Sequence, residues 1–166
     1  DETGEPIVRL GGELVPHGQE IRCGDVRADN PGNELVLRHD GHQSAMMVVG
    51  RGGEVLDRFD VPESPNNTGM EIVQWNGPDA AGVVYSPTVL LDGYGRLVPE
   101  FPGLPEPRGG RQGWFHCFPA NVCGDEREEV VLYDPWAASV FVYTPAPFDD
   151  AAYSGYEHTA RQYNTR

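Results

Sequence analysis

The sequence predicts an all-β protein built from antiparallel, four-stranded blades of the β-propeller type. Short apolar runs rich in β-branched and aromatic residues, such as 35–37, 83–85 and 140–143, recur along the chain. Turn residues separate these runs roughly every eight to twelve residues, and no segment carries a sustained helical stripe. Glycine (21) and proline (15) together supply 36 of the 166 residues, which favours tight turns over long helices.

Three segments, 20–61, 69–102 and 114–148, repeat one order of strands. In each segment an opening strand and a polar turn precede a second and a third strand. In the first two segments a glycine-rich hairpin leads into a fourth strand. Four short strands recurring every 35 to 45 residues or so are typical of propeller blades, with a β-sandwich of unrelated strands as the alternative. The expected strands are 21–26, 33–40 and 45–50, then 71–75, 81–86 and 88–92, then 116–122, 128–134 and 139–143.

Three blades do not close a propeller, which needs about four or more. We therefore expect residues 1–166 to form a single propeller segment that belongs to a larger propeller. The rest of that propeller comes either from the same parent chain or from another subunit. The aromatic-rich residues 149–166 are expected to form an extended segment against the sheets.

The charge of the chain restricts its partners. Its net charge is −14, and it contains no lysine, so that all twelve cationic side chains are arginines. Nucleic acids and anionic membranes bind cationic surfaces, so we expect neither as a partner. Cys117 and Cys123 either form a disulfide across a short loop or remain buried free thiols. Cys23 is expected to be a buried free thiol. The spacing of the three cysteines does not suit a zinc site.

Two acidic turns, 24–34 and 120–129, carry oxygen-bearing side chains at matching positions. Such oxygens can surround a calcium ion, or they can cap the turn by accepting backbone hydrogen bonds. Arg27 and Cys123 stand where an ideal calcium loop has a further oxygen ligand, which argues against the metal. The matched candidate ligands are Asp25 with Asn121, Asp29 with Asp125, and Glu34 with Glu129.

The same turns carry a resemblance to a known family. Residues 17–40 resemble a blade of the secreted β-propeller rhamnogalacturonan lyases, with His17-Gly18, an Asp-rich turn, then Pro31-Gly32 and Glu34. Residues 124–129 (Gly-Asp-Glu-Arg-Glu-Glu) and the strand that follows are similar to the C-terminal end of that family. The resemblance covers about 17–45 and 114–148. Propeller enzymes that act on rhamnose–glucuronate linkages resemble the chain equally.

The resemblance implies a secreted lyase that cleaves an acidic polysaccharide by β-elimination at a uronic acid, often with calcium. Such a reaction needs a cation for the carboxylate, a base for the C5 proton and an acid for the leaving oxygen. Arginine, histidine and tyrosine suit these roles. The candidate bases and acids are His116, His42 and His17, and the candidate substrate-binding residues are Arg108, Arg111, Asn66, Asn67, Trp75 and Trp114.

Each candidate has a structural alternative: a satisfied core histidine, an arginine that offsets an acidic surface, or a core tryptophan. The whole chain also has an alternative function, that of a non-catalytic propeller that binds a glycan or a protein. An enzyme should bring a histidine and an arginine together in an axial cleft, whereas a scaffold should expose an apolar patch.

Overall fold

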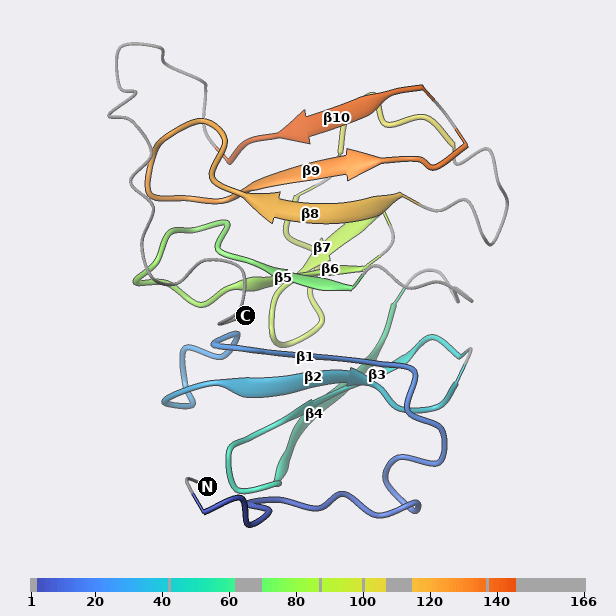
Figure 1. The fold of residues 1–166 in the computed structure, drawn as a ribbon, viewed down its shortest axis with the longest axis vertical. Helices are drawn as coiled ribbons and strands as arrows, with labels where there is room; N and C mark the ends of the chain where they lie inside the picture. Colours follow the sequence, from blue (N-terminus) through green and yellow to red (C-terminus); the bar gives the residue numbers. More distant parts are fainter. Residues whose placement is uncertain are drawn as a thin grey trace.

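The computed structural model describes residues 3–41, 43–61, 70–86, 88–99, 101–106, 115–136 and 138–145. These residues form ten strands in three antiparallel sheets (Figure 1). The prediction of an all-β fold is confirmed, since the described residues contain no helix. It follows that this part of the chain offers no helix long and apolar enough to cross a membrane.

The first sheet is a four-stranded meander in the order β1-β2-β3-β4. Its strands lie where the apolar runs predict them, and the hairpin between β3 and β4 turns at Gly53, whose φ is 90°. A β-bulge at Val48 and Val49 shifts the register of β3 against β4. The strands are β1 (Glu20–Gly24), β2 (Glu34–Arg38), β3 (Ala45–Val49) and β4 (Val55–Asp60).

The second and third sheets have three strands each, in the orders β5-β6-β7 and β10-β9-β8. The fourth strand predicted for the second segment is reduced to a single bridge between Leu91 and Leu97. Leu97 is 62% exposed, so little apolar burial stabilises it there, and Pro99 has no N–H to extend the pairing. The strands are β5 (Glu71–Val73), β6 (Val83–Ser86), β7 (Val89–Leu91), β8 (His116–Ala120), β9 (Glu129–Tyr133) and β10 (Val140–Tyr143).

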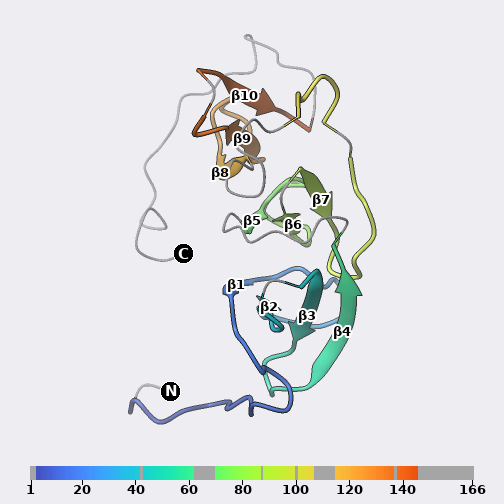
Figure 2. The same ribbon diagram turned by 90° about the vertical axis from the view of Figure 1, so that its right-hand side faces the viewer.

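The three sheets stack face to face in chain order (Figures 1 and 2). Their first strands are neighbours, because β1 contacts β5 and β5 contacts β8. We call the face that each sheet turns toward the next sheet along the chain its front face, and the opposite face its rear face.

Two hydrophobic clusters fill the spaces between the sheets. The first lies between the front of the first sheet (Val36, Met46 and Val48) and the rear of the second (Val84 and Leu91). The other lies between the front of the second sheet and the rear of the third, and is formed mainly by Val73, Val83, Tyr85, Leu90, Cys117, Val130 and Leu132. The second sheet is therefore buried on both faces, as the fully buried strand β6 shows.

The two interfaces repeat the same backbone contact. The Gly82 N–H donates to the Asp25 carbonyl over 2.7 Å, and the Glu128 N–H donates to the Gln74 carbonyl over 3.1 Å. In both pairs the acceptor directly follows the first strand of one sheet. The donor directly precedes the second strand of the next sheet. The sheets are thus related by one repeated packing rule.

The rear face of the first sheet has a different cover. Leu10 and Val15, from the segment before β1, pack against Leu37, Met47 and Val49. This segment protects the outer strands of the sheet at one end of the stack.

Candidate functional site

The two acidic turns close in the same way. The Glu34 carboxylate is fully buried and accepts hydrogen bonds from the backbone N–H groups of Val26 and Arg27, over 2.9 and 3.1 Å. Its second oxygen accepts from the Asn30 amide over 2.7 Å. A carboxylate that accepts several N–H groups fixes a turn strongly, because hydrogen bonds to a charged acceptor are among the strongest in proteins.

Glu129 repeats this role in the third sheet. It is also fully buried, and one of its oxygens accepts from the N–H groups of Val122 and Cys123 over 2.8 and 3.0 Å. The other oxygen, Oε1, has no hydrogen-bond donor in the described structure, since no amide takes the place that Asn30 has in the first turn. Asn121 braces the same turn by accepting from the Gly124 N–H over 2.7 Å and donating to the Asp125 carbonyl.

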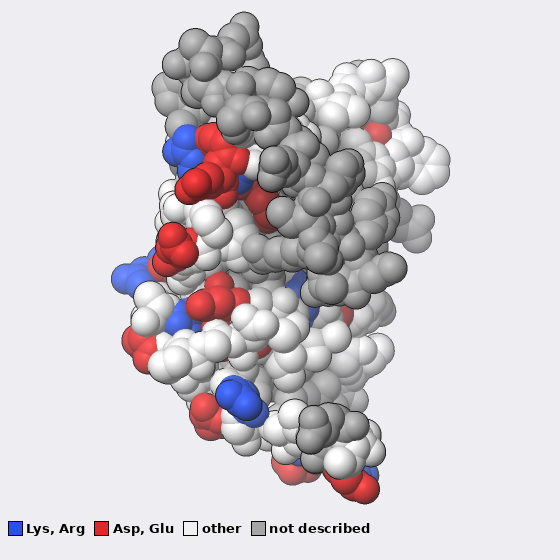
Figure 3. Space-filling model, turned by 60° about the vertical axis from the view of Figure 1, so that its left-hand side comes forward, with Lys and Arg blue, Asp and Glu red and all other residues white. Residues whose placement is uncertain are grey.

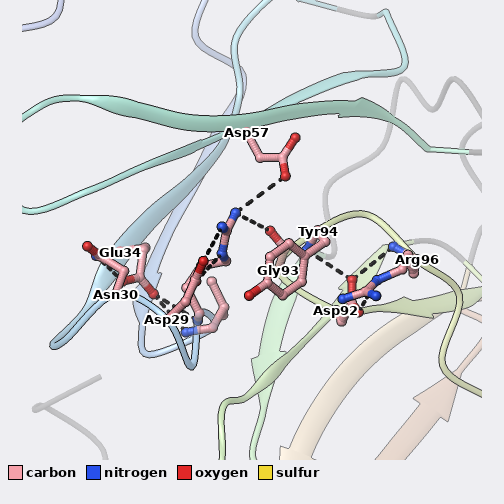
Figure 4. A network of polar contacts seen from close by, with 10 residues as sticks. Asp29, Asn30, Glu34, Asp57, Asp92, Gly93, Tyr94 and Arg96 are labelled. Carbon is pink, nitrogen blue, oxygen red and sulfur yellow. Dashed lines mark hydrogen bonds and ion pairs between the residues drawn. The ribbon is translucent and has the colours of Figure 1, made fainter.

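An arginine occupies the centre of the first turn. The Arg27 guanidinium is buried and donates to both carboxylate oxygens of Asp29, over 2.9 and 3.0 Å, and to Asp57 over 3.3 Å (Figure 4). It also lies 3.8 Å from the centre of the Tyr94 ring, a cation–π contact. The hydrogen bonds from Arg27 lower the pKa of Asp29 to about 2. Arg27 therefore ties the first turn to β4 and to the hairpin of the second sheet.

That hairpin depends on close approach at Gly93. A Cβ placed there would lie 2.2 Å from the Val26 carbonyl oxygen, so only glycine fits. Asp92 closes the hairpin by accepting from the N–H groups of Tyr94 and Arg96, each over 2.9 Å (Figure 4).

Carboxylates predicted as calcium ligands accept hydrogen bonds within both turns. Both oxygens of Asp29 bind Arg27, and both oxygens of Glu34 accept N–H donors. In the third turn Arg127 engages Asp125 over 2.5 Å, and that hydrogen bond lowers the pKa of Asp125. The described residues contain no group of three or more histidine, cysteine, aspartate or glutamate side chains placed to hold a metal. The side chains of Asp29, Glu34, Asp125 and Glu129 act as acceptors within the turns, as the capping alternative has it.

A polar cleft of about 490 Å³ opens between residues 76–80, in the turn that joins β5 to β6, and the acidic turn of the third sheet. Its walls carry three carboxylates, from Asp79, Asp125 and Glu126, and one guanidinium, from Arg127. Because Arg127 already pairs with Asp125, the cleft is a poor site for an anionic sugar. Figure 3 shows this side of the molecule, where red acidic groups outnumber blue arginines.

Two of the candidate catalytic histidines, His17 and His116, belong to the opposite end of the strands. His17 is exposed and pairs with Asp40 through a backbone bridge, and its Nδ1 would be 2.7 Å from a Cβ at Gly41. His116, half-buried at the start of β8, stacks on Tyr133 with 5.3 Å between the ring centres.

The remaining predicted site residues divide into two groups. Trp75 is only 8% exposed and lies in the cluster between the second and third sheets, so its ring is not open to a sugar. Asp25 contributes its backbone carbonyl to the sheet interface. His42, Asn66, Asn67, Arg108, Arg111 and Trp114 lie outside the described residues.

The described cysteines form no disulfide with one another. Cys117 faces the second sheet from β8, whereas Cys123 lies in the third turn. Burial and the neighbouring Glu129 carboxylate raise the pKa of Cys123, which disfavours its thiolate.

Two features of the site were not predicted from the sequence: the partners of Arg27, and a second buried arginine. Arg38 is fully buried in the first sheet interface, where it donates to the Ser86 hydroxyl over 2.5 Å and lies 3.7 Å from Glu20. The sequence pattern that could have indicated this burial is the position of Arg38 directly after the apolar residues 35–37 of β2. For the turns, the signal was an aspartate and an arginine two positions apart, in 27–29 and again in 125–127.

Comparison of the chain with protein-family models, curated proteins and solved structures gave no match.

Proposed function

We propose that the chain forms three blades of a carbohydrate-directed β-propeller of the rhamnogalacturonan-lyase type. The observation that carries this proposal is the repeat in three dimensions. Glu34 and Glu129 close equivalent turns with the same pair of N–H donors. The sheets pack front to rear by one repeated rule, with their first strands together, as successive blades around an axis do.

The proposal gives the resembling residues a structural task. Asp29, Glu34, Asp125 and Glu129 are occupied in closing the turns, so they would shape the blades rather than touch substrate. The acidic character of the cleft beside the third turn also directs an anionic polysaccharide elsewhere.

The substrate side is then the opposite end of the strands. β2 ends there before His39 and Asp40, β4 ends there at Asp60, and β8 begins there at His116. Among the described histidines, exposed His17 is best placed to accept the C5 proton of a uronate, with Asp40 beside it. His17 would take the C5 proton, the C4–O bond would break as the departing oxygen takes a proton from solvent, and a C4–C5 double bond would remain in the sugar.

The test is an assay of the chain with rhamnogalacturonan and with a rhamnose–glucuronate glycan. We expect the ultraviolet absorbance of the unsaturated uronate to rise with time. Replacement His17→Ala should lower the rate by about 100-fold or more, the usual contribution of a general base. The matched variant His116→Ala should keep the rate, because His116 lies in the sheet against Tyr133. Equal loss in both variants would contradict the assignment to His17.

A non-catalytic binding module is the second candidate function. It is favoured by the exposed apolar side chains on the third sheet, among them Phe118, Val140 and Val142. Titration calorimetry with the same glycans separates the two functions. Binding without a rise in absorbance would assign a binding module, and neither binding nor cleavage would overturn the carbohydrate proposal.

A further inference from the structure

The front face of the third sheet lies at one end of the stack. Phe118, Val140 and Val142 project from this face and are 56%, 65% and 51% exposed. Val131 shares the face between them, because the register pairs it with both Phe118 and Val142. No other described sheet packs on this face. The face is uncharged at these four positions, although the chain carries a net charge of −14.

The equivalent positions in the other sheets are buried. Aligning Glu129 with Glu34 places Val140 at the position of Met46 and Val142 at that of Val48, and both of those side chains are fully buried. In the second sheet Leu90 occupies the position of Val142, and it too is fully buried. The third sheet thus keeps the apolar front face that the first two sheets use to bind a neighbour.

At the other end of the stack, part of the rear face of the first sheet is exposed. Ile21, on the rear face of β1, is 53% exposed, whereas the equivalent residues Met70 and Cys117 are 0% and 9% exposed. Leu10 and Val15 cover the outer strands of this rear face, but the cluster that they form contains no residue of β1. The first strands make the closest approach between sheets, so exposed Ile21 lies where a neighbour would come nearest, while Leu10 and Val15 would present the covering of β2 and β3 to it.

We propose that the front face of the third sheet binds the rear face of the first sheet of a second copy of this chain. The contact follows the head-to-tail direction of the existing stack, with β8 of one copy beside β1 of the next and the segment that carries Leu10 and Val15 forming part of the interface. Asn121 follows β8 as Asp25 follows β1, and Asn33 precedes β2 as Gly82 precedes β6. The Asn33 N–H of the second copy would therefore donate to the Asn121 carbonyl, as Gly82 donates to Asp25.

His116 and Tyr133 would also lie in this interface. They occupy the positions of Glu20 and Arg38, which meet in the interface between the first and second sheets. A head-to-tail contact is heterologous, so it adds copies until a ring closes. The inference is independent of the carbohydrate proposal, because it rests on packing alone.

Sedimentation velocity of the chain from about 1 μM to about 1 mM covers the range in which weak interfaces assemble and dissociate. We expect particles whose mass is a multiple of 18.2 kDa at high concentration, and the monomer on dilution. The variants Val142→Glu and Ile21→Glu should each remain monomeric throughout. The control Leu97→Glu alters a residue that is 62% exposed and lies outside both faces, and it should assemble like the wild type.

A mixing experiment tests the direction of the contact. Val142→Glu keeps an intact rear face and Ile21→Glu an intact front face, so an equimolar mixture should form a dimer of twice 18.2 kDa and no larger particle. A wild type that stays monomeric at all concentrations would overturn the proposal. So would loss of assembly in Val142→Glu with normal assembly in Ile21→Glu, since that pattern belongs to two third sheets packed face to face. Both residues are exposed in the monomer, and circular dichroism checks that the variants fold.

Discussion

Single charged residues fix the turns of this protein from inside. Glu34 and Glu129 each hold two backbone N–H groups without any exposure to solvent, so each turn depends on one carboxylate. Arg27 adds a buried cation that joins Asp29, Asp57 and Tyr94. The first acidic turn was predicted either to bind calcium or to be capped by hydrogen bonds. In the structure the Arg27 guanidinium is the cation at its centre.

Replacement Glu129→Gln should destabilise the fold by about 2 kcal/mol, because charge-assisted hydrogen bonds become neutral ones and an amide N–H₂ enters a buried site. Urea denaturation measures the free energy of unfolding. The control Glu126→Gln changes an exposed carboxylate in the same turn and should leave stability within about 0.5 kcal/mol of the wild type. Equal effects in the two variants would show that Glu129 does not support the turn.

The lowered pKa of Asp29 predicts how the stability of the fold depends on pH. Its pKa is about 2 in the folded protein because Arg27 donates to it, against about 3.9 in an unfolded chain. A carboxyl group with a lowered folded pKa stabilises the fold above the unfolded pKa, and this contribution disappears as the pH falls through the folded pKa. Melting temperatures should therefore fall between about pH 4 and pH 2, and less steeply in Asp29→Asn. Asp79→Asn, at an exposed cleft position, should follow the wild-type curve.

At the scale of the element, strands were predictable and their partners were not. Runs such as 45–49 and 129–133 are set by local composition and bounded by turn residues, so the sequence predicted them to within a few residues. The equivalence of Asp25 to Asn121, and of Glu34 to Glu129, was predicted from the repeated spacing of the two turns. The contacts of Arg27 with Asp57 and Gly93 could not follow from it, because the partners are 30 and 66 residues away and meet only after the sheets stack.

The stack also determines which apolar residues matter. Leu90 is fully buried between the second and third sheets, so Leu90→Ala should cost about 2 to 5 kcal/mol through lost burial and the cavity left behind. Val140→Ala, on an exposed front-face residue, should cost about 0.5 kcal/mol or less in the dilute monomer. Chemical denaturation at low protein concentration compares them. Similar losses in both would mean that the third sheet's front face is covered within one molecule.

At the scale of the whole molecule, charge is the dominant feature. Twenty-six acidic residues face twelve arginines, and the arginines with ion pairs in the described structure, such as Arg27 and Arg127, are tied to nearby carboxylates. The uncompensated negative charge repels itself in the compact state. Salt screens such long-range repulsion strongly, whereas it screens the pair formed by buried Arg27 much less.

Added salt should therefore raise the melting temperature. We expect a steady rise in thermal melts between about 10 mM and about 500 mM sodium chloride, as the screening length falls from about 30 Å to a few ångströms. Potassium chloride at the same ionic strength should give the same curve, since screening does not depend on the identity of the cation. A fall in melting temperature with salt would mean that the ion pairs at Asp29, Asp57 and Asp125 contribute more to stability than the net charge of −14 removes.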